Sequence, residues 1–187
     1  MSAIRSFPGL LAKMRGCGAC CPPSVCGAEI FWSFVGAFGG IAAVAWLHEA
    51  VADPIGLSML IGSFGASAVL LYGAPKSPLA QPRNLVGGHV LSALVGVTTR
   101  LALPGAPGWL VCALAVAAAI ALMHATRTLH PPGGATALIA VTGGPKLMAL
   151  GYVYAVFPVL SGALVMLACA LLANNLAPNR RYPEYWF

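Results

Sequence analysis

The distribution of charge constrains this chain more than any other feature of its sequence. Of its 187 residues, 59% are hydrophobic and 7% are charged, whereas an average soluble domain has about 25% charged residues. Between Glu29 and Arg180, charged side chains occur only at Glu49, Asp53, Lys76, Arg83, Arg100, Arg127 and Lys146. The intervals between them are long enough to cross a bilayer, whose hydrocarbon core needs about 20 residues of helix. The sequence therefore predicts an all-α membrane protein that crosses the bilayer several times.

Six apolar segments follow one another along the chain. They lie at about 29–48, 54–74, 84–103, 108–125, 131–143 and 149–174. All of them are expected to be helical, because irregular backbone cannot face lipid. At about 1.5 Å per residue the fifth segment reaches only about 20 Å, whereas the hydrocarbon core is about 30 Å thick. The sequence therefore predicts one unusually short helix within the membrane domain.

The charges at the segment ends predict an orientation. With six crossings and a cytoplasmic N-terminus, the inner ends hold Arg5, Lys13, Arg15, Lys76, Arg83, Arg127, Arg180 and Arg181. The outer ends hold only Arg100 and Lys146, which agrees with the excess of Lys and Arg in cytoplasmic loops. We therefore expect a basic cytoplasmic segment at 1–27, a membrane domain at 28–176 and a cytoplasmic tail at 177–187, in a bacterial inner membrane. The basic residues are dispersed rather than clustered, so no nucleic-acid partner is expected.

The chain also repeats part of its own sequence. The stretch GASAVLLYGAPK at 65–76 aligns with GATALIAVTGGPK at 134–146 when one residue is inserted in the second copy. This alignment suggests two repeats of three segments each, at about 28–103 and 108–174. An odd number of crossings inverts the second repeat relative to the first, an arrangement found in many transporters. Chance similarity between two Ala- and Gly-rich stretches is the alternative.

The repeat also predicts where two helices begin inside the membrane. The alignment sets Pro131 and Pro132 against Gly62 and Ser63, so the second helix should be interrupted near GSFG and the fifth should begin near HPPGG. Proline suits the first helical turn, where its missing N–H would have no partner. Free N–H groups at such a start, with the helix dipole behind them, favour an anion. Two inverted helix starts would point at one place.

These considerations define a candidate binding site for a small anion. The first choice is the backbone donors and hydroxyl groups at the two helix starts: Ser63, Gly65, Ala66, Ser67, Gly133, Gly134, Ala135 and Thr136. Arg127 and His130 come second, as a source of positive charge or as a gate, because ionisable residues at membrane depth are costly and often functional. Arg127 could equally end the fourth segment at the inner surface, and His130 could cap a helix. His89, near the start of the third segment, is interpreted first as a packing residue.

Two stretches resemble a known family. HPPGGATALIAV at 130–141 and FGASAVLLYGAPKSPLAQPRNLVGGHVLSALVGV at 64–97 are similar to the HPP family of integral membrane proteins, named after the tripeptide at 130–132. The similarity covers about residues 28–175. The family is described as having four membrane helices, which puts full crossings by the second and fifth segments in question. Some photosynthetic members are implicated in nitrite transport, so the resemblance implies a small-anion transporter with nitrite as the leading substrate.

Small residues recur at every fourth position in two segments. They are Gly36 and Gly40 in the first segment, and Gly88, Ser92 and Gly96 in the third. Such faces let helix backbones approach closely, within one bundle or between protomers. We therefore expect close helix packing, and a homo-oligomer is a weaker expectation.

Other functions are weaker hypotheses. The chain has four acidic residues, none paired within an apolar segment, and it lacks G-x-S-x-G, H-E-x-x-H and phosphate-loop motifs, so an enzyme is not expected. No cofactor or metal is expected either, because CGACCPPSVC at 17–26 contains one C-x-x-C without the second pair or the histidines of a zinc site. The alternative functions are an anion channel and a transporter of another small solute.

Overall fold

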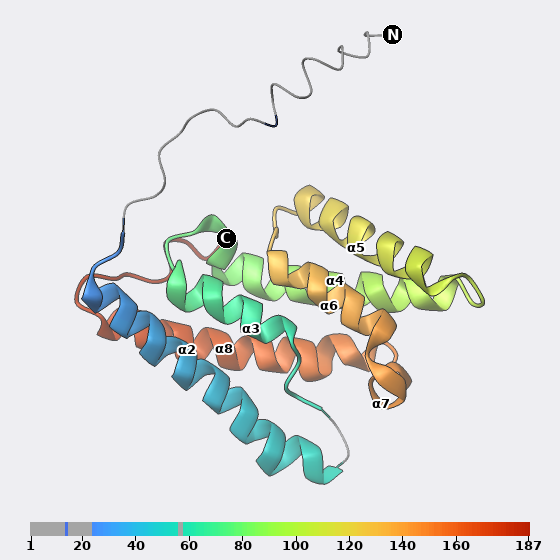
Figure 1. Cartoon of the computed structure of the whole chain (residues 1–187), viewed down its shortest axis with the longest axis horizontal. Helices are drawn as coiled ribbons and strands as arrows, with labels where there is room; N and C mark the ends of the chain where they lie inside the picture. Colours follow the sequence, from blue (N-terminus) through green and yellow to red (C-terminus); the bar gives the residue numbers. More distant parts are fainter. Residues whose placement is uncertain (1–13, 15–23, 56–57) are drawn as a thin grey trace, which may run out of the picture.

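The computed structural model describes residues 14, 24–55 and 58–187 (Figure 1). Regular structure within these ranges is helical throughout. The predicted N-terminal segment at 1–27, with most of its cysteines, lies almost entirely outside the described residues. The described part of the chain thus comprises the membrane domain and the C-terminal tail.

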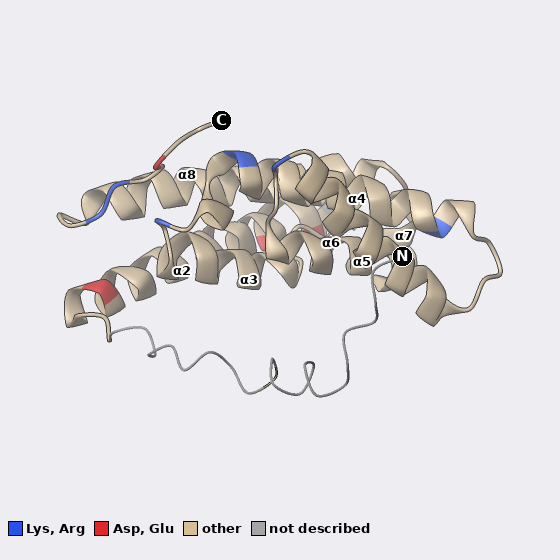
Figure 2. Ribbon diagram, turned by 90° about the horizontal axis from the view of Figure 1, so that it is seen from above, with Lys and Arg blue, Asp and Glu red and all other residues tan. Residues whose placement is uncertain are grey.

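Among the described residues, four helices are long and apolar enough to cross a membrane. They are α2 with its continuation η1, Gly27–Ala52; α4, Pro82–Ala102; α5, Gly108–Ala125; and α8 with the preceding η5, Ala155–Leu176. The shortest has 18 residues and extends about 27 Å, close to the thickness of the hydrocarbon core. Figure 2 shows how few charged residues interrupt this bundle. The chain is an integral membrane protein.

Three further helices are shorter than a membrane crossing. Helix α3, Ser63–Ala68, continues as η3, Val69–Gly73, whereas α6 spans Pro131–Thr142 and α7 spans Gly144–Ala149. Residues 58–62 are not helical, so the second segment is interrupted near GSFG, and α6 begins at the first proline of HPPGG. Both helix starts agree with the sequence prediction. Six full crossings and an inverted repeat are not confirmed, because two of the predicted segments are too short in the structure to span.

The short helices α3 and α6 run antiparallel and overlap at their first turns. In Figure 1 both begin near the middle of the bundle, and α3 extends to the left while α6 extends to the right. The contacts follow the same order, because Ser63 at the start of α3 reaches Thr136 inside α6, whereas Ser67 reaches His130 just before α6. Helix α6 packs mainly on α4 and α5, and α3 packs on α6, α2 and α8. At about 1.5 Å per residue, α3 with η3 and α6 together extend about as far along the bundle as one membrane-crossing helix.

Glycines allow the helices to approach closely, as the recurrence of small residues predicts. Gly36 and Gly40 on α2 lie against the ring of Tyr72, and a Cβ at Gly36 would be 2.6 Å from Cδ1 of that ring. Gly96 on α4 lies against α6, where a Cβ would be 2.5 Å from the carbonyl oxygen of Ala137. Both small faces are therefore used within one chain. A homo-oligomer stays a prediction.

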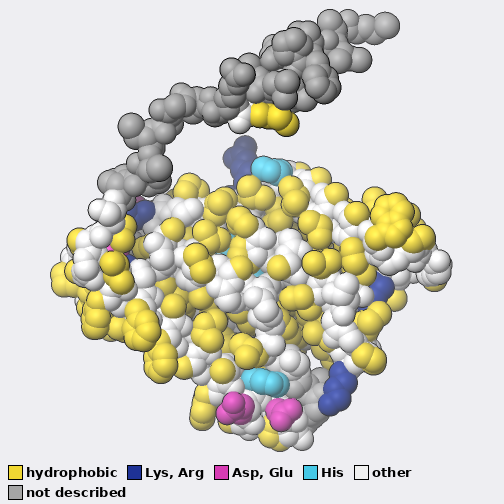
Figure 3. Space-filling view, in the orientation of Figure 1, with side chains coloured by type: hydrophobic (Ala, Val, Ile, Leu, Met, Phe, Trp, Pro, Cys, Tyr) yellow, Lys and Arg dark blue, Asp and Glu magenta, His cyan; other side chains and the backbone are white. Residues whose placement is uncertain are grey.

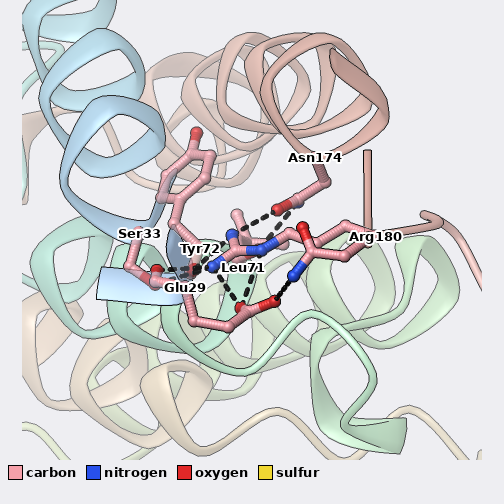
Figure 4. A network of polar contacts seen from close by, with 7 residues as sticks. Glu29, Ser33, Leu71, Tyr72, Asn174 and Arg180 are labelled. Carbon is pink, nitrogen blue, oxygen red and sulfur yellow. Dashed lines mark hydrogen bonds and ion pairs between the residues drawn. The ribbon is translucent and has the colours of Figure 1, made fainter. Parts of the chain in front are cut away.

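An ion pair between a buried arginine and a partly exposed glutamate holds the C-terminal tail to the bundle (Figure 4). The Arg180 side chain is 1% exposed and donates to Glu29 Oε2 at 2.6 Å, to Tyr72 O at 3.0 Å and to Asn174 Oδ1 at 3.1 Å. It also donates to Ser33 Oγ at 2.9 Å. These partners belong to α2, η3 and α8, so one guanidinium joins three elements. We call these five residues the Arg180 network.

A second polar region surrounds the turn η2, Asp53–Ile55. A pocket of about 290 Å³ there is lined by residues that include His48, Asp53 and Lys146. Figure 3 shows acidic side chains at one edge of the molecule and hydrophobic side chains over most of the same face. Exposed aromatic side chains on α2, such as Phe34, which is 69% exposed, suit contact with lipid.

Candidate functional site

A cluster of hydroxyl and imidazole side chains is buried where α3, α4 and α6 meet. Its members, which we call the polar cluster, are Ser63, Ser67, His89, His130 and Thr136, and none is more than 1% exposed. Ser63 and Ser67 lie one turn apart on α3, and His89 is on α4. His130 immediately precedes α6, and Thr136 lies within α6. Polar groups in a membrane domain are costly unless they are bonded. The bonds within the cluster therefore determine which hydrogen-bond donors and acceptors it contains.

Short hydrogen bonds hold the polar cluster together. Ser67 Oγ lies 2.7 Å from His89 Nε2 and 2.9 Å from His130 Nε2. His89 Nδ1 lies 2.7 Å from Thr136 Oγ1, which in turn lies 3.0 Å from Ser63 Oγ. One continuous chain of hydrogen bonds thus links α3, α6 and α4.

A backbone carbonyl fixes the direction of this chain when both imidazoles are neutral. His130 Nδ1 lies 2.8 Å from Leu79 O, and a carbonyl oxygen can only accept, so Nδ1 carries the hydrogen. The Nε2 atom of a neutral His130 must then accept from the Ser67 hydroxyl, and Ser67 Oγ accepts from His89 Nε2. His89 Nδ1 is left as an acceptor for the Thr136 hydroxyl. Each of these four contacts then has one donor and one acceptor, and the single Thr136 hydrogen is not available to Ser63 Oγ, 3.0 Å away, in this neutral state.

Glycines and an aromatic ring close the space around the two histidines. A Cβ at Gly88 would be 2.5 Å from His130 Cβ, and a Cβ at Gly133 would be 2.8 Å from the carbonyl oxygen of Gly88. The Phe64 ring meets the His89 ring edge-on, with the ring centroids 5.5 Å apart. The glycines of GGH and HPPGG therefore let α4 and α6 come close enough to share the cluster.

The backbone at the two helix starts supplies few free donors. Pro131 and Pro132 have no N–H, and the N–H of Gly133 donates to His130 O at 2.8 Å. In α3 the N–H groups of the second and third residues donate to carbonyl oxygens before the helix, at 3.0 and 3.2 Å. This differs from the expectation that free backbone amides point into the site. The donors at the cluster are instead hydroxyl and imidazole groups.

Several of the predicted site residues lie away from the polar cluster. Arg127 is exposed and has a φ of 57°, which places it in a left-handed turn after α5. Gly65 and Ala66 are on the exposed side of α3. Gly134 and Ala135 line an apolar groove between α5 and α6. Of the predicted residues, the structure brings together Ser63, Ser67, His130 and Thr136, with Gly133 packed beside them.

The central position of His89 was not predicted from the sequence. This side chain bonds a serine of α3 and a threonine of α6, and so joins the two short helices through α4. The available signal was its place next to Gly88, on the small-residue face of α4 that packs against α6. The bond from His130 to Leu79 O had no sequence signal, because every residue supplies a carbonyl oxygen.

The connection that supplies this carbonyl oxygen is held by the C-terminal tail. It contains the turn η4, Pro78–Ala80, followed by Gln81. Tyr182 Oη donates to Ala80 O at 2.7 Å, and the N–H of Glu184 donates to Gln81 Oε1 at 2.9 Å. Burial raises the pKa of the Tyr182 phenol above its usual range, so the hydroxyl remains a donor to Ala80 O even at a pH at which an exposed tyrosine, with a pKa of about 10, would ionise.

The polar cluster offers hydrogen bonds and titratable imidazoles but no fixed charge. Within the described ranges, no group of three or more His, Cys, Asp or Glu side chains is placed to hold a metal ion. Arg83, at the start of α4, has its Nη2 directed to Thr126 O at 2.8 Å. The arrangement suits a small solute that accepts hydrogen bonds.

The crossing helices, the short antiparallel pair and the buried cluster define a polytopic α-helical membrane protein. The chain belongs to the HPP transmembrane family, because residues 22–183 match the sequence model of that family, described as the HPP transmembrane region. This match confirms the resemblance predicted from the two motifs.

Two similar proteins are transmembrane proteins of Dictyostelium discoideum. One is 51% identical over 161 residues, which cover 85% of this chain and 56% of that protein. The other is 52% identical over 161 residues, which cover 85% of this chain and 51% of that protein. The chain thus spans about half the length of these curated relatives. No solved structure matches the chain.

Proposed function

We propose that this protein carries a small inorganic anion across a membrane and binds it at the polar cluster. One observation carries the proposal: α3 and α6 begin inside the bundle and bring hydroxyl and imidazole groups to one buried place from opposite directions. Hydroxyl and imidazole N–H groups are donors that an anion accepts. Interrupted helices that meet within the bundle are common at the binding sites of transporters.

A carrier fits this site better than a channel, which is the alternative mechanism. The side chains of the polar cluster are at most 1% exposed and bond to one another, so a solute has to replace these bonds. In a carrier, such a site opens to one side at a time. The antiparallel course of α3 and α6 supports the proposal that two inverted repeats, about 28–103 and 108–174, move relative to each other.

Nitrite is the first substrate to test. It follows from membership of the HPP family, some photosynthetic members of which are implicated in nitrite transport, rather than from the geometry. Nitrite is small and presents oxygen acceptors, which suits donors on several sides of the polar cluster. Other small anions share this chemistry, and a neutral small solute is the alternative substrate.

We also propose that both termini face the cytoplasm. Lys76, in the connection after η3, and Arg180, in the C-terminal tail, line the same pocket, so these basic ends lie on one side of the bundle. Lys146 lines a different pocket, together with Asp53. The excess of basic residues on the first side supports its assignment as the inner side. Residence in a bacterial inner membrane stays a prediction.

Anion binding to the purified protein tests the proposed function. The melting temperature is measured with nitrite, nitrate, formate, bicarbonate, chloride and sulfate, on the wild type, Thr136→Val and His130→Ala. Thr142→Val is the matched control, because this exposed hydroxyl of α6 bonds only to Leu138 O, at 3.0 Å. At about 100 times its Kd a ligand adds about 2.7 kcal/mol, which corresponds to a shift of several degrees.

We expect one small anion to stabilise the wild type and Thr142→Val but neither cluster variant. If no anion shifts the melting temperature of the wild type, anion binding is wrong and a neutral solute becomes the leading hypothesis. If an anion does bind, a counterflow experiment in liposomes distinguishes a carrier from a channel, since a carrier exchanges labelled for unlabelled substrate and a channel does not.

A further inference from the structure

An anion at the polar cluster would need a compensating charge. Moving an unpaired charge into an apolar interior costs far more than a few hydrogen bonds return. Among the bonds of the described residues, none joins the cluster to a Lys or Arg side chain. Arg83 donates to a backbone carbonyl elsewhere, and Arg127 is exposed. The positive charge must therefore arise within the cluster.

Only the imidazoles among the groups packed here can become positive. Helix α4 contributes His89, and the connection before α6 contributes His130. Tyr154, ahead of η5, donates to Thr136 O at 3.2 Å, but a phenol ionises to an anion. Helix α3 contributes serine hydroxyls and a phenyl ring, and α8 contributes a glycine against that ring. The histidines are thus the source of charge.

The geometry lets one proton enter while every heavy atom keeps its place. A proton delivered to Thr136 Oγ1 moves the threonine hydrogen to His89 Nδ1, and the hydrogen on His89 Nε2 passes to Ser67 Oγ. The Ser67 hydrogen then passes to His130 Nε2. The contact between His89 and Ser67 is 2.7 Å long, and the contact between Ser67 and His130 is 2.9 Å long. His130 now bears hydrogen on both nitrogens and one positive charge, and Thr136 donates to Ser63. Release of the proton along the same path restores the neutral chain.

We propose that the chain Thr136, His89, Ser67 and His130 takes up one proton with each anion, so that the protein is a proton–anion symporter. This inference rests on the proposed function, because both concern the same site. Protonation supplies the charge that holds the anion and turns His130 Nε2 into a donor. Loss of the proton removes both, so anion and proton leave together.

Driving forces on the full chain in liposomes test this coupling. Nitrite uptake is measured under a pH gradient at zero potential, and separately under a potassium diffusion potential at equal pH. Nitrous acid that diffuses through the lipid drives nitrite to the same final ratio, so the quantity compared is the initial rate of uptake above that of protein-free liposomes. An electroneutral symporter accumulates nitrite about tenfold per pH unit when the lumen is the alkaline side, and the membrane potential does not change this accumulation. An uncoupled anion carrier does not respond to the pH gradient. It accumulates nitrite about tenfold per 60 mV of membrane potential when the lumen is positive.

The outcomes separate this inference from the proposed function. Uptake that the pH gradient alone drives, faster than in protein-free liposomes, supports symport. Accumulation driven by the potential alone overturns symport but leaves anion transport standing. Uptake no faster than in protein-free liposomes, for nitrite and for every other anion tested, overturns both.

Variants assign the coupling to the histidines. We expect His89→Gln and His130→Gln to lose the uptake driven by the pH gradient, whereas His124→Gln, on the exposed side of α5, retains it. Each variant is checked for folding by its melting temperature and its elution as a single species. If either cluster variant takes up nitrite under the pH gradient as fast as the wild type, after the rate in protein-free liposomes is subtracted, the histidines do not carry the proton. The experiment on the wild type stands whether or not a variant folds.

Discussion

The Arg180 network and the polar cluster are both extensively hydrogen-bonded around buried side chains, but they differ in charge. Arg180 carries a permanent positive charge that is neutralised by Glu29 at 2.6 Å, and its remaining donors point at fixed acceptors. In the polar cluster, hydroxyl and imidazole groups both donate and accept, so its bonds can change direction. The first network suits holding elements together, and the second suits responding to a solute.

The largest expected effect is on stability, from Arg180→Ala. It leaves Glu29 without its ion-pair partner and removes the donor to Tyr72 O and Asn174 Oδ1. Breaking a fully buried pair from one side costs about 3–5 kcal/mol. Because the Glu29 side chain is 28% exposed, we expect a loss at the lower end of this range in the unfolding free energy measured in detergent. Arg181→Ala, on an exposed neighbour, should cost less than about 0.5 kcal/mol. If the two variants lose the same unfolding free energy, the Arg180 network does not have the structural role described here.

Gly88→Ala should destabilise the site through crowding alone. The added Cβ would be 2.5 Å from His130 Cβ and 2.8 Å from Thr128 O, and overpacking of this kind costs about 1–3 kcal/mol. Gly65→Ala, where nothing lies within 4 Å of the added Cβ, should be neutral or slightly stabilising. Comparing the two melting temperatures tests the close approach of α4 to the connection that leads into α6. A harmless Gly88→Ala would contradict it.

Ser67→Ala distinguishes the polar cluster from the Arg180 network, because we expect a modest effect on stability and a large effect on transport. The serine is the shared partner of His89 and His130, so its loss breaks the chain of hydrogen bonds and costs about 1–2 kcal/mol. Substrate-dependent uptake in liposomes should fall to the level without protein. A variant that transports normally would show that the cluster, like the Arg180 network, is structural.

The smallest expected effect is at Tyr182, and it depends on pH. Tyr182→Phe removes the donor to Ala80 O and should cost about 1 kcal/mol near pH 7. Burial raises the pKa of this phenol in the folded state, so the folded protein holds its proton more tightly than the unfolded chain. The stabilisation is complete below about pH 10 and is lost as the pH rises further. Thermal unfolding from pH 7 to 11 should therefore show a smaller alkaline loss in the variant, and identical slopes would contradict this.

The sequence alone determined the class of protein and the positions of two helix starts. Long uncharged intervals require membrane helices whatever their packing. Proline in HPPGG places a helix start at Pro131, because its ring fits the first turn and disrupts a later one. These are local effects, which act over a few neighbouring residues. The HPP family membership could likewise be predicted from contiguous motifs.

Only the tertiary structure decided which polar side chains share a site. Ser67 lies 22 residues from His89 and 63 residues from His130, and their meeting depends on how three helices are rotated about their axes. The same packing leaves Arg127 exposed and turns Arg180, predicted as a marker of orientation, into a buried structural residue. Hydropathy and turn chemistry set where helices begin and end, whereas contacts between distant segments depend on the close packing that glycine faces allow.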